Sequence, residues 1–196
     1  MNSEIKKRIN TGLILFLILI LMFLSKIVYI FISMVIFVLS FIEFSKMTKR
    51  IFKNKIFKFL LINFVFLFYL FLFLLVFIIS VNDIQLKIIL FTILLICSAS
   101  DIGGIIFGKT FKGPKLTKIS PNKTYAGVFG SFLLSIIFTS FYLKNLDNFN
   151  IFLNDYAQIK MIIFILFISI ISQIGDLIIS FFKRKSNVKN TGNIIP

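Results

Sequence analysis

Long apolar runs separated by short polar stretches dominate the sequence. The first run, residues 12–44, is interrupted at Ser25-Lys26 and is too long for one membrane helix, which needs about 20 residues. We therefore predict two helices, over about 11–25 and 27–44, joined by a tight turn. Similar runs predict four further membrane helices, over about 57–81, 84–100, 125–143 and 161–182.

This pattern predicts an all-α, polytopic membrane protein with about six transmembrane helices. We expect a single helical membrane domain over 1–196, with N-terminal helices in 1–100 and the candidate chemistry in 101–196. The composition agrees, because 59% of residues are hydrophobic, 15% are charged and the mean hydropathy is +1.03, whereas soluble domains keep about a quarter of their residues charged. The absence of histidine excludes His-based acid–base chemistry and His metal ligands.

The charge is strongly basic, with 22 Lys and Arg against 7 Asp and Glu. In a soluble protein this balance would suggest a nucleic-acid partner. Most of the basic residues, however, fall in four segments, which are 1–10, 46–58, 101–124 and the tail from 183 onward. Six alternating helices would place all four on one side, which the positive-inside rule makes cytoplasmic. We therefore predict cytoplasmic termini and no nucleic-acid partner.

Asp176 is the most informative carboxylate because it lies inside the last predicted helix. A charge at that depth is costly unless it faces a polar cavity, a partner or a metal. Steps of three and four residues place it in one polar stripe, formed by Ser169, Ser172, Asp176, Ser180 and Lys183 with Gln173 beside it. The stripe is either hydrogen-bonding surface between helices or, as we favour, the polar wall of an active cavity.

Residues 101–124 are predicted to form a loop that holds phosphate, opened by a second acidic residue, Asp101. Its glycines, at 103, 104, 108 and 113, would let backbone N–H groups approach an anion. Ser120, Lys123 and Thr124 come just before the helix predicted from 125, whose N-terminus favours phosphate, and Pro121 suits a helix start. A basic loop resting on anionic headgroups also fits. With Asp176, the pattern indicates a metal–phosphate site.

The helix predicted over 125–143 carries small residues at every fourth position, namely Gly127, Ser131, Ser135 and Thr139. Such a face allows close approach of helix backbones, so we predict packing rather than chemistry for it. A homodimer through this face is a further expectation.

Several motifs, in this order, resemble the signature of the phosphatidate cytidylyltransferases (CDP-diacylglycerol synthases). They are Asp101-Ile-Gly103, Ser120-Pro121-Asn-Lys123-Thr124, Gly175-Asp176, and Ser180-Phe-Phe-Lys183-Arg184 with Lys189-Asn190-Thr-Gly192. The resemblance covers roughly 95–196 through motifs and the remaining chain through helix layout only.

The resemblance implies a CTP-dependent nucleotidyltransferase of phospholipid biosynthesis in the bacterial cell (inner) membrane. It would condense CTP with phosphatidic acid, giving CDP-diacylglycerol and diphosphate. Asp176, Lys123 and Asp101 would be catalytic, with Mg²⁺ held by Asp176. The substrate phosphates would be bound by Ser120, Pro121, Thr124, Ser180, Lys183, Arg184 and Lys189.

Three departures from the family pattern keep alternatives open. Asn190 stands where the family usually has Asp, and Ala126 stands where an acidic residue is common. The sequence also ends at Pro196, before the family's H-G-G and D-R-x-D segment, which supplies a second metal-binding aspartate. One alternative is therefore a truncated, inactive fragment. Others are a membrane scaffold or small transporter, and a CTP-dependent transferase acting on another lipid, such as a polyprenol.

Overall fold

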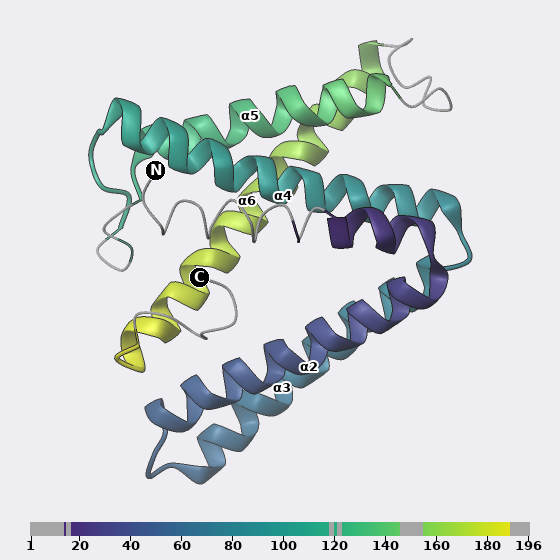
Figure 1. The fold of residues 1–196 in the computed structure, drawn as a ribbon. Helices are drawn as coiled ribbons and strands as arrows, with labels where there is room; N and C mark the ends of the chain where they lie inside the picture. Colours follow the sequence, from purple (N-terminus) through teal and green to yellow (C-terminus); the bar gives the residue numbers. More distant parts are fainter. Residues whose placement is uncertain (1–13, 15–16, 118–119, 121–122, 146–154, 189–196) are drawn as a thin grey trace. The chain divides into compact units, whose positions relative to one another are not determined.

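A computed structural model describes residue 14 and residues 17–117, 120, 123–145 and 155–188. The described residues form long α-helices and no strand, apart from one isolated antiparallel bridge between Lys115 and Thr124. The helices are α2 (Lys26–Ile51), α3 (Ile56–Ser80), α4 (Ile84–Phe111), α5 (Tyr125–Lys144) and α6 (Asp155–Lys185) (Figure 1). In this part of the chain, five helices are long and apolar enough to cross a membrane. The predicted all-α, polytopic membrane fold is confirmed.

The predicted boundaries hold for α3 and α5 within one residue, and three helices are longer than expected. α6 begins at Asp155 and ends at Lys185, beyond both ends of the predicted 161–182. α2 continues to Ile51, into the predicted basic loop. α4 continues to Phe111, so the loop predicted over 101–124 is wrong for residues 101–111. The helix ends only where Lys112 and Gly113 adopt positive φ angles of 48° and 111°. The first predicted helix, 11–25, lies partly outside the described residues. Within it, residues 17–24 are described and are helical.

The chain divides into two compact units. One unit comprises residues 1–87 and 182–196, and the other comprises 88–181. The division falls inside α4 and α6, so each of these helices contributes to both units.

In the first unit, α2 and α3 form a hairpin, and the two helices lie side by side (Figure 1). Two buried polar pairs join α2 to α3 along the hairpin. The Tyr29 hydroxyl lies 2.8 Å from Ser80 Oγ, and Asn63 Nδ2 donates to Thr48 Oγ1 at 2.9 Å. Such pairs satisfy polar groups in a membrane, where no water is available to do so.

In the second unit, α4 and α5 lie side by side (Figure 1). They pack closely through small residues. A Cβ added to Gly103 would overlap the backbone carbonyl of Gly130. Ser131 Oγ donates to the carbonyl oxygen of Ser100 at 2.7 Å, and Ser100 Oγ lies 2.9 Å from Ser169 Oγ of α6. The small residues of α5 that the sequence singled out are all buried, so their predicted packing role is confirmed.

Candidate functional site

A polar cavity of about 710 Å³ lies within the second unit. Its walls come from the second half of α4, the segment before α5, the first turns of α5, and α6. Most of the residues around it are charged, hydroxyl-bearing or glycine. A cavity with several convergent polar groups is the first place to look for a binding site.

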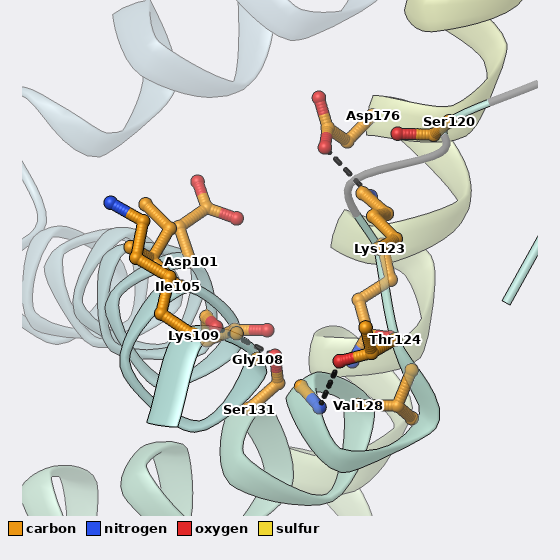
Figure 2. A pocket seen from close by; sticks show the side chains of 14 residues that line it. Asp101, Ile105, Gly108, Lys109, Ser120, Lys123, Thr124, Val128, Ser131 and Asp176 are labelled. Atoms are coloured by element: carbon orange, nitrogen blue, oxygen red, sulfur yellow. Dashed lines mark hydrogen bonds and ion pairs between the residues drawn. The ribbon is translucent and has the colours of Figure 1, made fainter. Parts of the chain in front are cut away.

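An ion pair between Lys123 and Asp176 is the main electrostatic feature of this cavity. Lys123 Nζ lies 2.7 Å from an oxygen of the Asp176 carboxylate (Figure 2). The two side chains are 25% and 56% exposed, so both remain accessible from the cavity. Two oppositely charged groups that solvent can reach are able to exchange this contact for contacts with a bound ligand.

Asp101 and Lys109 lie on the opposite wall. Both belong to α4, and their spacing of eight residues places them on one helix face with Ile105 between them. Figure 2 shows these three residues across the cavity from Lys123 and Asp176. The cavity therefore contains two carboxylates and two lysines.

The segment before α5 is held by backbone hydrogen bonds that position Lys123. The N–H of Leu116 donates to the carbonyl of Lys123 at 2.8 Å, and the N–H of Tyr125 donates to the carbonyl of Pro114 at 3.2 Å. Thr124 caps α5, because its Oγ1 accepts from the N–H of Gly127 at 3.1 Å (Figure 2). The Thr124 hydroxyl keeps its own proton to donate to a ligand.

The glycines at 103, 104 and 108 do not form the predicted anion-binding loop. They lie inside α4, where the backbone follows the helix. Gly104 and Gly108 instead give α5 room, since a Cβ on them would lie 3.0 Å from Ser131 Oγ and 3.3 Å from Thr124 Oγ1. Gly113, with its φ of 111°, is in the loop as predicted.

α6 supports both interpretations of its polar stripe. Ser169 is fully buried and pairs with Ser100, which is hydrogen bonding between helices. Asp176 and Gln173, further along, line the cavity. Gln173 Nε2 is buried and has no hydrogen-bond partner among the described residues, so it is an unused donor at the cavity wall.

The predicted site residues have three outcomes. The cavity brings together Asp101, Ser120, Lys123, Thr124 and Asp176. Ser180 is not among the lining residues, and Lys183 and Arg184 lie in the last turn of α6, within the other unit. Pro121 and Lys189 lie outside the described residues.

Lys109 and Ser131 line the cavity without having been predicted as site residues, and Gln173 was predicted only as a neighbour of the polar stripe. Lys109 lies eight residues after Asp101, a spacing that places both on one face of a helix. The helix predicted from the sequence ends at about residue 100, so the spacing was not used. Ser131 was assigned to packing, and it has both roles because it lies where α5 faces both α4 and the cavity.

The donors around the cavity fit a magnesium ion. They are oxygen atoms from two carboxylates and several hydroxyls, and the described residues hold no group of three or more His, Cys, Asp or Glu that could bind a metal by themselves. Mg²⁺ is usually bound by one or two carboxylates together with the phosphates of a substrate, so two carboxylates are enough.

Comparison with known proteins gives a consistent result. The model of the cytidylyltransferase family matches residues 6–196. A phosphatidate cytidylyltransferase of Rickettsia conorii is 42% identical over 99 residues, covering 49% of this chain and 42% of that protein. One from Rickettsia felis is 40% identical over 124 residues, covering 60% and 52%. One from Staphylococcus epidermidis is 37% identical over 113 residues, covering 57% and 40%.

The chain thus spans about half the length of these curated relatives. No solved structure matches it. The family match includes α2 to α6 and every described residue of the cavity. The chain belongs to the cytidylyltransferase family.

Proposed function

We propose that the cavity catalyses the condensation of CTP with phosphatidate, which yields CDP-diacylglycerol and diphosphate. The observation that carries this proposal is the Lys123–Asp176 ion pair at 2.7 Å, set in a cavity with a second carboxylate and a second lysine. The relatives named above are phosphatidate cytidylyltransferases, which supports the same reaction here.

The reaction joins two anions, so charge sets its main barrier. An oxygen of the lipid phosphate attacks the α-phosphorus of CTP, and a new P–O bond forms. The bond from that phosphorus to the bridging oxygen of the β-phosphate breaks, and diphosphate leaves with the electron pair. Catalysis then depends on neutralising phosphate charge and aligning the two reactants.

The residues of this cavity can neutralise phosphate charge and orient the two reactants. Lys123 and Lys109 supply positive charge from two walls. Ser120 and Thr124 can donate hydroxyl hydrogen bonds to phosphate oxygens. Asp176, with Asp101 across the cavity, would hold Mg²⁺ together with the nucleotide phosphates. When bound, the ion would screen charge that develops on the transferring phosphorus group.

The membrane setting suits a lipid substrate. The five membrane-length helices indicate a multi-pass membrane protein, and the named relatives are bacterial. We place it in the cytoplasmic (inner) membrane with the cavity open to the cytosol, where CTP is found. The basic segments support this orientation through the positive-inside rule. A homodimer stays a prediction, but the small-residue face of α5 is buried within the chain and is not available as its interface.

The proposal is tested with membranes that contain the expressed protein, CTP labelled on its α-phosphate, phosphatidate and Mg²⁺. We expect label in a lipid that co-migrates with CDP-diacylglycerol and an equal amount of released diphosphate. Diacylglycerol, which lacks the attacking phosphate, should accept no label. Transfer to a polyprenyl phosphate and not to phosphatidate would contradict the proposed acceptor, and no CTP-dependent lipid labelling would contradict the reaction.

Gln173 offers a test that separates stability from activity. Its Nε2 is buried without a partner in the described residues, and an unsatisfied buried donor costs about 1–3 kcal/mol. We therefore expect Gln173→Met to raise the free energy of unfolding by about 1 kcal/mol. The same change should lower kcat/KM for CTP by about tenfold, because the donor is lost to the substrate. Unfolding in detergent and initial rates measure the two effects, and lower stability with normal kinetics would contradict this role.

A further inference from the structure

A second cavity lies in the first unit, at the turn between α2 and α3. Its volume is about 520 Å³, and it is lined mainly by residues 51–55 together with Lys58 and Lys185. Four of its seven lining residues are lysines, at positions 53, 55, 58 and 185. None of the described residues that line it is acidic. A cavity with this lining is built for an anion.

The positive charge of this cavity is uncompensated on three of its lysines. Within the part of the chain that the structure describes, Lys53, Lys55 and Lys58 form no salt bridge. α3 starts at Ile56 with no side-chain cap on its N-terminus and no acidic residue in its first turn. The positive end of the helix dipole therefore adds to the lysine charges. Like charges this close favour binding of an anion, which reduces their repulsion.

The neighbouring surface is apolar, which indicates what kind of anion fits. α2 ends at Ile51 and α3 begins at Ile56, and both are membrane-length helices, so the cavity lies at a membrane–water boundary. Ile56 and Phe57 are 73% and 77% exposed beside the lysines. A ligand that joins a phosphate to acyl chains would contact both surfaces. A soluble phosphate would use only the lysines.

We propose that this cavity binds the headgroup phosphate of an anionic phospholipid drawn from the bilayer. Basic pockets at the ends of membrane helices commonly hold such headgroups. The site belongs to a different unit from the polar cavity, and it requires no step of the proposed transfer reaction. Loss of lipid binding at this cavity and loss of cytidylyl transfer can therefore be observed independently.

A single-tryptophan reporter tests the site directly. The chain contains no tryptophan, and Phe52 lines the cavity, so Phe52→Trp places one fluorophore in its wall. The protein is reconstituted in phosphatidylcholine, and phosphatidylglycerol or phosphatidylcholine carrying a quencher near the headgroup is titrated in. We expect phosphatidylglycerol to bind at least about tenfold more tightly. Each lysine near an anionic headgroup contributes about 1 kcal/mol, or about fivefold in affinity, so two lysines that contact the headgroup are sufficient.

Two triple variants separate the cavity from general surface charge. Replacing Lys53, Lys55 and Lys58 with Gln should bring the two lipids to within about twofold. Replacing Lys46, Lys49 and Arg50 with Gln removes the same charge from nearby exposed positions that do not line the cavity. This matched variant should keep most of the preference, because these three side chains do not line the cavity and cannot contact a headgroup bound inside it.

Three results would overturn the proposal. The first is equal binding of the two lipids by the reporter protein, and the second is an equal loss of preference in both triple variants. The third is displacement of the lipid by inorganic phosphate, but not by chloride at the same ionic strength, which would assign the cavity to a free anion. Native mass spectrometry of the chain without the Phe52→Trp change provides an independent count of retained phosphatidylglycerol.

Discussion

Replacing Asp176 with Asn is expected to lower cytidylyl transfer by about three orders of magnitude, in the range seen when one group that stabilises transition-state charge is removed. Asn keeps the size of the side chain and removes its charge. The cavity then loses a carboxylate ligand for Mg²⁺, and Lys123 loses the partner that lies 2.7 Å away. Because the pair is partly exposed, its contribution to stability is at most about 1 kcal/mol. The expected loss is therefore chemical and does not come from unfolding.

Measuring CTP binding separates the role of Asp176 as a metal ligand from its electrostatic repulsion of the CTP phosphates. Without divalent cations, CTP should bind the Asp176→Asn protein as tightly as the parent or more tightly, because one negative charge has left an anion site. The matched control is Asp83→Asn. Asp83 accepts from the N–H of Gln85 at 2.8 Å at the start of α4 and lies in the other unit. The amide oxygen of Asn can accept the same hydrogen bond, so this control should change both stability and transfer little. More than about a tenth of the parental rate in Asp176→Asn would contradict the assignment.

The membrane helices could be predicted from the sequence because the requirement is simple. A span needs about 20 apolar residues, and the polar break at Ser25-Lys26 marks the start of α2. The end of α4 could not be predicted in the same way. Gly103, Gly104 and Gly108 indicated a loop, since each glycine costs about 1 kcal/mol in a helix. Packing against α5 requires their small size and outweighs that cost.

The charged residues of the site were predictable because they stand out against an apolar background. Asp176 and Lys123 were chosen for that reason and by the motifs, and the structure brings them into contact. Neither the ion pair nor the unpartnered Gln173 amide follows from sequence, because both depend on how α6 lies against the segment before α5. The lysines of the second cavity were visible only as a topology signal. Their grouping depends on the α2–α3 turn meeting the end of α6.

Gly127→Ala is expected to destabilise the second unit by about 2 kcal/mol, a typical cost of overpacking. The added Cβ would lie 2.8 Å from the backbone carbonyl oxygen of Gly104. A backbone atom inside a helix cannot rotate away, so α4 and α5 would have to separate. Separation would weaken the hydrogen bond from Ser131 to the Ser100 carbonyl, one turn further along. It would also disturb Thr124, whose Oγ1 accepts from the N–H of Gly127, so transfer should fall as well.

Gly175→Ala is the matched control, because it makes the same change inside α6 where no atom of the described residues lies within 4 Å of the added Cβ. Relief of the helix penalty of glycine should stabilise that variant by up to about 1 kcal/mol. The two substitutions should therefore shift the midpoint of unfolding in mixed detergent in opposite directions, as followed by circular dichroism. Equal shifts would mean that helix propensity alone decides both, and that α4 and α5 are not in close contact at Gly127. Opposite shifts would establish that contact, which supports two walls of the cavity.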